Sequence, residues 1–336
     1  MKRNRFAIGV GINHYFGSGK NELTGCHEDV KTVMGLLKNQ YNEATEFDVE
    51  EHIDEVKSSL KTQITTDALR ALVGKVFNPN RKLEVALFYF AGHGAPGKSE
   101  REFYLLSSDA KRPEHGMPMR EVLDAANQCD KIQERIVILD CCHSGHMGDM
   151  SVGDGKMTSI SDGVTILAAC GKREEAMELE HSGGLFTRLL VEALEGGAAD
   201  VLGCVTLASI YNFIDLRLNM AQQRPVFKAS LSRLVSLRMC PPLIVSKILK
   251  KSLATFSHPD EHYSLNHSHE SEIDESKRKQ PFNPEAGKVF RGLQDLRAVG
   301  LVEPVGHKDM YWAAFHCLSC RLTLTGKLYW HTIIKR

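Results

Sequence analysis

Two short apolar runs in this chain end abruptly at reactive side chains, and they limit the possible fold more than any other feature. Residues 85–90 run into Ala91-Gly92-His93-Gly94, and residues 136–139 run into Asp140-Cys141-Cys142-His143-Ser144-Gly145. Continuous apolar runs of this length are typical of strands in a buried parallel sheet. Chemistry in such sheets gathers beyond the carboxyl ends of the strands, so a His and a Cys delivered there suggest a nucleophile with its base.

Helical patterns alternate with apolar runs through the first 240 residues. We predict strands at 6–12 and 164–170 and helices at 28–37, 65–76, 118–126 and 185–194, where apolar residues recur every three or four positions. This alternation predicts an α/β fold, with right-handed crossovers, a mostly parallel sheet and helices on both faces.

Composition narrows the class of protein. The 336 residues are 42% hydrophobic and 25% charged, a balance that predicts a globular protein with one large and one small domain. A formal net charge of zero gives no general attraction to nucleic acid or membranes. Nine scattered cysteines favour reduced thiols over a disulfide scaffold. With no apolar segment at the start long enough for a signal peptide or membrane span, we expect a cytoplasmic location.

The character of the sequence changes after residue 240. We predict a linker at 241–280, in which residues 258–280 are polar with the composition of disorder, and a small α+β domain at 281–336. A helix near 286–299 and paired strands near 311–315 and 321–324 resemble a winged-helix domain. From Leu243 onward there are 14 Lys and Arg against 10 Asp and Glu, an excess too small to indicate nucleic-acid binding. We therefore expect residues 281–336 to bind a protein activator or recruiter.

The two reactive motifs have a catalytic and a structural interpretation. A thiol with an unperturbed pKa near ~8.5 is a poor nucleophile at neutral pH unless a base or cation sits beside it, and His93 could supply that base. Alternatively, buried cysteines pack as small hydrophobic residues. Both motifs lie in glycine-rich turns, where small residues let a substrate backbone approach, and this favours catalysis.

Both motifs resemble the catalytic motifs of caspase-like cysteine peptidases, most closely the prokaryotic metacaspase-type branch. Residues 167–176 and 183–187 resemble the small-subunit half of that fold, and the whole resemblance covers about residues 6–237. It implies a caspase-like peptidase domain at 1–240. Within it, the large-subunit-like part is 1–146, a flexible loop is 147–162 and the small-subunit-like part is 163–240.

The resemblance also implies roles for single residues. Cys142 would be the nucleophile and His93 the general acid and base, with the backbone N–H groups of Gly94 and Cys142 forming the oxyanion hole. The S1 pocket, which binds the residue before the cut, would be lined by Asp29, Asp140, Cys26 and Ala91. Two carboxylates in a narrow pocket favour Arg or Lys there. For Asp29 the alternative is a solvated residue that stabilises a helix start.

Metal use and processing are further expectations. Many metacaspases hold calcium with several acidic side chains, including an Asp-Asp pair where this chain has Met119-Arg120-Glu121-Val122. Asp109 is among the residues that could match other ligands, but too few oxygens remain for a cation that needs six to eight, so we expect calcium-independent activity with no metal or other cofactor. Lys156 and, as a second candidate, Arg173 are predicted sites of self-cleavage. The family's habits imply regulated proteolysis in stress, cell death or antiviral defence. The competing possibilities are a catalytically silent scaffold with this fold and other acyl-transfer chemistry at the same dyad.

Overall fold

The computed structural model describes residues 4–16, 21–57, 60–98, 102–141, 160–169, 184–218, 225–231 and 233–335. The chain divides into two compact units, each with its own hydrophobic core. Unit 1 contains residues 1–200 and 204–240, and unit 2 contains residues 201–203 and 241–336. No helix among the described residues is long and apolar enough to cross a membrane.

Unit 1 is built on a six-stranded sheet with strand order β12-β10-β9-β5-β1-β2, as traced through the described residues. Neighbouring strands pair in parallel, except for β12, which runs antiparallel to β10. The strands are β1 (Arg5–Gly11), β2 (Asp48–Ile53), β5 (Leu83–Ala91), β9 (Ile132–Asp140), β10 (Val164–Ala168) and β12 (Val226–Ser230). The mostly parallel α/β sheet predicted from the sequence is confirmed.

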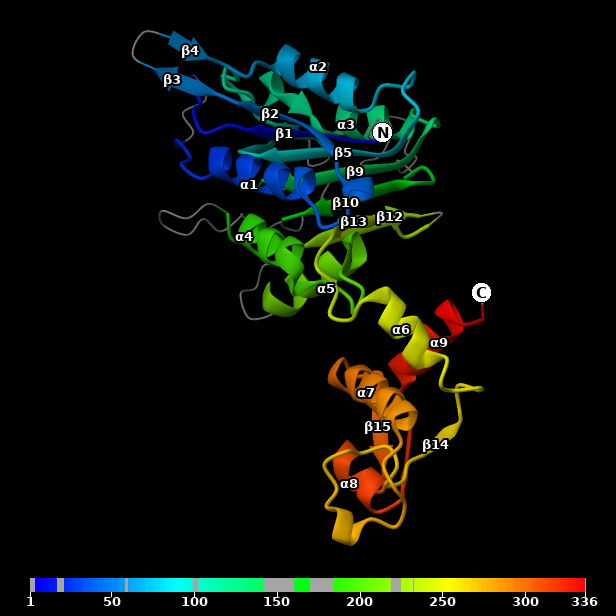
Figure 1. The fold of residues 1–336 in the computed structure, drawn as a ribbon. Helices are drawn as coiled ribbons and strands as arrows, with labels where there is room; N and C mark the ends of the chain where they lie inside the picture. Colours follow the sequence, from blue (N-terminus) through cyan, green and yellow to red (C-terminus); the bar gives the residue numbers. More distant parts are fainter. Residues whose placement is uncertain are drawn as a thin grey trace. The chain divides into compact units, whose positions relative to one another are not determined.

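Helices cover both faces of this sheet. Figure 1 shows α1 and α4 on one face and α2 and α3 on the other. The helices of unit 1 are α1 (Cys26–Lys38), α2 (Thr66–Val76), α3 (Met119–Asn127), α4 (Leu185–Glu192), which continues into a π-helical turn (Ala193–Gly197), and α5 (Leu207–Leu218). Because helices shield both faces, β5 is buried along almost its whole length, which explains its continuous apolar run.

Short strands complete unit 1. Among the described residues, two antiparallel pairs are formed by β3 (Glu55–Lys57) with β4 (Leu60–Thr62) and by β11 (Cys204–Thr206) with β13 (Ser236–Met239). A three-stranded antiparallel ribbon consists of β6 (Gly94–Pro96), β7 (Phe103–Leu105) and β8 (Met117–Pro118). The ribbon β6-β7-β8 begins directly after His93, because β6 starts at Gly94.

Unit 2 corrects two sequence predictions. Its elements are α6 (Ser246–Leu253), β14 (His262–Ser264), α7 (Pro284–Ala298), β15 (Val302–Val305), α8 (Met310–Phe315), β16 (Ser319–Leu322) and α9 (Leu324–Ile333). The strands form an antiparallel sheet in the order β14-β16-β15.

The predicted linker at 241–280 is wrong, because this segment forms α6 and β14 and contributes to the second core. Leu249, Leu253 and Phe256 are buried there. The polar part is held by its own side chains: buried His267 accepts the backbone N–H of Lys279 at Nδ1. Polar composition therefore did not indicate disorder here.

The strand predicted at 311–315 is also wrong, because α8 occupies that position. Asp309 caps the helix by accepting the Tyr311 backbone N–H. Met310, Ala313 and Ala314 are buried, and their spacing is that of one helix face. Aromatic residues such as those in this segment are enriched in strands, but the cap and the buried face select a helix.

Candidate active site

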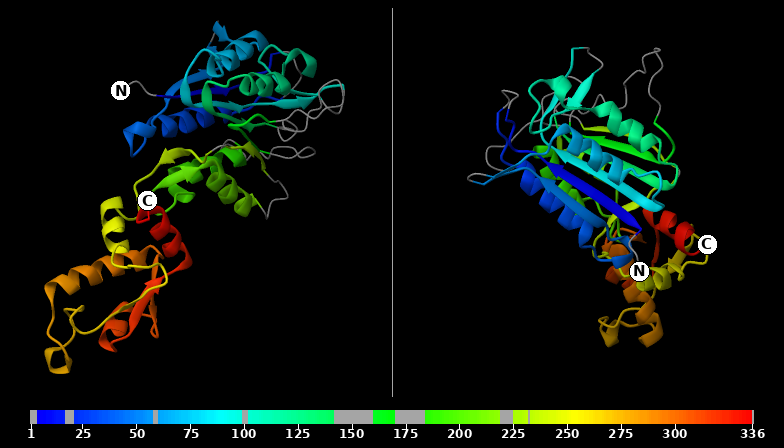
Figure 2. Two further views of the ribbon diagram at one scale, coloured as in Figure 1. Left: turned by 90° about the vertical axis from the view of Figure 1, so that its right-hand side faces the viewer. Right: turned by 90° about the horizontal axis from the view of Figure 1, so that it is seen from above.

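The ends of β5 and β9 bring the two reactive motifs to one edge of the sheet. Ala91 pairs directly with Asp140, and the Gly92 backbone N–H donates to the Asp140 carbonyl oxygen at 3.2 Å. His93 lies two residues beyond Ala91. Cys142 lies two residues beyond Asp140, outside the described residues, as do Lys156 and Arg173. Both motifs therefore begin at the ends of two neighbouring strands, β5 and β9, of this sheet (Figure 2).

His93 is held by two residues of the segment that links β1 to α1. Its backbone N–H donates to the Tyr15 hydroxyl at 2.7 Å, and the two rings lie 4.7 Å apart. Its Nε2 lies 2.9 Å from the carbonyl oxygen of Asn21. Since a carbonyl oxygen only accepts, Nε2 carries a proton in this arrangement.

Tyr15 and Asn21 were not identified from the sequence. Neither belongs to a periodic pattern or motif, and they approach His93 only through the packing of the β1–α1 segment. Burial raises the pKa of Tyr15 well above its ordinary value, so its hydroxyl stays protonated at neutral pH. A Cβ at Gly92 would lie 2.7 Å from the Tyr15 hydroxyl oxygen. Glycine before His93 therefore leaves room for the tyrosine that holds it.

Asp140 is buried at the end of β9, where it is the final acceptor of a chain of two hydroxyl groups, those of Tyr89 and Thr187. The Thr187 hydroxyl, from α4, donates to Oδ2 of Asp140 at 2.6 Å. The Tyr89 hydroxyl lies 2.6 Å from Thr187 Oγ1 and is its donor, because Thr187 has given its own proton to Asp140. Gly184 permits this approach, since a Cβ there would lie 2.4 Å from Oδ2.

Asp29 lies near the same hydroxyl chain. It is half-buried in the first turn of α1. Burial, followed by the negative charges of Asp140 and Asp29, raises the pKa of Tyr89 well above its ordinary value. Both negative charges therefore act on the Tyr89 hydroxyl. The position of Asp29 in the first turn of α1 also fits the alternative role, stabilisation of the helix start.

Cys26 and Ala91, the other residues assigned to the pocket, are both buried. Cys26 begins α1, and its backbone N–H donates to Asn13 Oδ1 at 3.1 Å. Ala91 ends β5, and its carbonyl oxygen accepts the Ile12 backbone N–H at 3.0 Å. Ala91 thus joins the β1–α1 segment to the strand that precedes His93, whereas Cys26 joins the start of α1 to that segment.

Gly94 directs its backbone N–H away from β7. It pairs with Leu105, and the flanking Leu106 N–H donates to the His93 carbonyl oxygen at 2.9 Å. In an antiparallel ladder this pattern makes Gly94–Leu105 the non-hydrogen-bonded pair, whose N–H groups point outward from the partner strand. Cys141, the residue before the predicted nucleophile, is buried, with 1% of its surface exposed.

The segment compared with the calcium site is occupied by protein contacts. Glu121 binds Arg70 at 2.8 Å, while Met119 and Val122 are buried. Asp109 accepts the Ser107 hydroxyl at 2.7 Å. These carboxylates are already engaged by other side chains.

Comparisons with known proteins agree with this geometry. The family model described as the caspase domain matches residues 4–236. Metacaspase-5 of Trypanosoma cruzi is 26% identical over 159 residues, which are 43% of this chain and 33% of that protein, so the match spans about one third of the relative's length. The crystal structure of caspase-1 from Spodoptera frugiperda is similar with a TM-score of 0.52 at 13% identity, covering 71% of this chain and 91% of that chain. This structural likeness supports the fold.

Proposed function

Because this chain belongs to the caspase-domain family of cysteine peptidases, we propose that it is an endopeptidase with Cys142 as nucleophile and His93 as its acid and base. The proposal rests chiefly on the in-register ends of β5 and β9, from which both motifs emerge. The burial of Cys141 supports the choice of Cys142, since a 1% exposed thiol cannot meet a substrate.

The proposed reaction forms and breaks a thioester. The Cys142 thiolate attacks the scissile carbonyl carbon, and the backbone N–H of Gly94, together with that of Cys142, stabilises the oxyanion. With Nε2 protonated toward Asn21, Nδ1 of His93 would exchange the proton with Cys142 and deliver it to the leaving amine. Water, deprotonated by the same nitrogen, then hydrolyses the thioester and restores the thiol.

Cleavage after Arg or Lys is the specificity that the carboxylates support. The negative charges of Asp140 and Asp29 both raise the pKa of Tyr89, and the Thr187 hydroxyl donates to Oδ2 of Asp140. A substrate guanidinium or ammonium group entering this region would pair with a carboxylate, whereas a substrate Asp would face two like charges.

Peptide cleavage tests the activity and the specificity together. The purified chain, with reductant and chelator, should cleave fluorogenic peptides ending in Arg or Lys but not those ending in Asp. Cys142→Ala should abolish cleavage, whereas the adjacent Cys141→Ala is the matched control and should retain it. Absence of cleavage by the wild type on all three peptides would favour the scaffold alternative, and equal loss in both variants would contradict the assignment of the nucleophile.

Calcium independence and self-cleavage belong to the same proposal. The engagement of Glu121 by Arg70 and of Asp109 by Ser107 supports activity without calcium, and stimulation by calcium after exhaustive chelation would contradict it. Self-cleavage after Lys156, with Arg173 as a second site, would make mass-spectrometric fragments that the Cys142→Ala chain does not produce.

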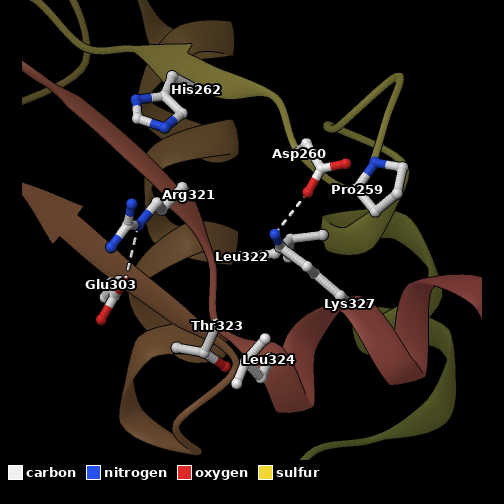
Figure 3. Close-up of a pocket in the computed structure, with 9 residues that line it drawn as sticks. All are labelled: Pro259, Asp260, His262, Glu303, Arg321, Leu322, Thr323, Leu324 and Lys327. Atoms are coloured by element: carbon white, nitrogen blue, oxygen red, sulfur yellow. Dashed lines mark hydrogen bonds and ion pairs between the residues drawn. The ribbon is translucent and has the colours of Figure 1, made fainter.

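Unit 2, and within it residues 281–336, is proposed to bind a protein activator or recruiter rather than nucleic acid. Figure 3 shows a pocket in this unit where the cationic side chains are already paired, Arg321 with Glu303 at 2.8 Å and Lys327 with Asp260. Such paired cations are poorly suited to bind phosphates. The proposed setting is cytoplasmic, regulated proteolysis in stress, cell death or antiviral defence.

A further inference from the structure

A cluster of two histidines and one aspartate lies beside the β1–α1 segment. His14 follows β1, His27 lies in the first turn of α1, and Asp54 directly follows β2. Nδ1 of His14 lies 2.7 Å from Oδ2 of Asp54, and Nε2 of His27 lies 2.7 Å from Oδ1. One ligand atom from each residue can be chosen so that all three lie within 4.8 Å of one another.

The carboxylate of this cluster is fixed before any ligand arrives. Asp54 is 0% exposed, and its two oxygens accept the backbone N–H groups of Asn13 at 2.8 Å and of His14 at 2.9 Å. Metal sites typically orient their ligands through such outer hydrogen bonds. The side chains of His14 and His27 are 24% and 19% exposed, so an ion can reach them from solvent.

We propose that His14, His27 and Asp54 form a binding site for a divalent transition metal such as Zn²⁺. Two imidazole nitrogens and one carboxylate oxygen are a common zinc ligand set, whereas calcium requires six to eight oxygens. No local motif marks this site in the sequence, because its members span 40 positions. Three protein ligands leave a fourth tetrahedral position for water.

Binding requires a small rearrangement and no net release of protons from neutral imidazoles. Each imidazole moves its proton to its other ring nitrogen, and the lone pair that this frees coordinates the metal. Zinc–ligand bonds of about 2.0–2.2 Å at tetrahedral angles separate ligand atoms by roughly 3.3–3.5 Å. The 2.7 Å contact between an imidazole nitrogen and the carboxylate oxygen that binds the metal must therefore open by roughly 0.7 Å. The partial exposure of both rings gives them room to move.

Zinc binding by the full chain tests the proposal. The measurement uses the Cys142→Ala chain, because the catalytic thiol would compete for zinc. Equilibrium dialysis with Zn²⁺ alone should show one tight equivalent beyond any bound by other cysteines. His14→Asn and His27→Gln place an amide N–H near the lost ring N–H, so each can keep the hydrogen bond to Asp54 without an imidazole ligand. Each should weaken that equivalent at least tenfold, and His52→Gln, which alters a partly exposed histidine beside Glu50, should not.

Chemical protection provides a readout that needs no variant at the site. Diethylpyrocarbonate modifies unprotonated imidazole nitrogens, and mass spectrometry locates the adducts. Zinc should protect His14 and His27 of the Cys142→Ala chain but leave His52 reactive. Unchanged modification of both histidines in the presence of zinc, or unchanged zinc affinity in the two folded variants, would overturn the site.

Discussion

Thr187 is the central member of the hydroxyl chain that ends at Asp140, so its replacement by valine should have a large effect for an isosteric change. Thr187 is 1% exposed and Tyr89 is fully buried, so water cannot readily replace a lost partner. Thr187→Val removes a hydrogen bond to a carboxylate, worth about 1.5–3 kcal/mol, and leaves the Tyr89 hydroxyl without its acceptor, at about 1 kcal/mol or more. We expect a loss of about 3 kcal/mol in the free energy of unfolding of unit 1.

A double-mutant cycle separates the two parts of this loss. Tyr89→Phe leaves the bond between Thr187 and Asp140 intact and should cost about 1 kcal/mol. In that background Thr187→Val no longer strands a phenol, so it should cost about 2 kcal/mol, giving a coupling of about 1 kcal/mol between the two positions. Additive losses, or a loss below about 1 kcal/mol for Thr187→Val alone, would refute the proposed hydroxyl chain.

Urea unfolding can assign this loss to the right unit. The Cys142→Ala background would prevent the proposed self-cleavage during the measurement. The two tryptophans of the chain, Trp312 and Trp330, both lie in unit 2, so their fluorescence follows that unit while far-UV circular dichroism follows both. Thr187→Val should shift the dichroism transition of unit 1 and leave the tryptophan transition in place.

Three further predictions follow from single residues. Tyr15→Phe removes the acceptor of the His93 N–H and should lower kcat on an Arg peptide about tenfold, with little change in KM, because one hydrogen bond of about 1.4 kcal/mol positions the base; an unchanged kcat would contradict this positioning role. Burial raises the pKa of Cys320 to about 12, so iodoacetamide at neutral pH should label exposed Cys317 and leave Cys320 unmodified in the native chain, as mass spectrometry can show. Burial lowers the pKa of His269, so the unfolded state binds the proton more readily; the stabilisation is present above the unfolded pKa of about 6.5 and is lost as the pH falls below it. The urea midpoint followed by tryptophan fluorescence should therefore be lower at acidic pH. His269→Gln should make that midpoint less dependent on pH.

The sequence predicted the parts of the fold that depend on continuous local patterns. The runs that became β5 and β9 are buried on both faces, so almost every residue had to be apolar, and the pattern was visible without partners. The same argument located Asp140 and His93 at one edge, because parallel strands end together.

Contacts over long separations carried no comparable signal. Asp54 meets His14 and His27 from positions 40 and 27 residues away, and Asn21 meets His93 across 72 residues. In unit 2 the polar composition of residues 258–280 suggested disorder, yet side-chain hydrogen bonds such as that of His267 order the backbone there. Composition measures how much apolar surface a segment can bury, and it cannot reveal polar side chains that satisfy the backbone locally.

The register between β5 and β9 ties the chemistry of the site to the stability of the sheet. Ala91 lies opposite Asp140 because eight residue pairs, from Leu83–Ile132 to Ala91–Asp140, fix the two strands together. A slip of one residue would move one motif about 3.3 Å along the strand and turn its side chains to the other face. The proposed nucleophile and base must meet within hydrogen-bond reach, so such a slip should separate them. The apolar core of the sheet therefore sets the point from which both reactive motifs begin, while Tyr15 and Asn21 of the β1–α1 segment hold His93.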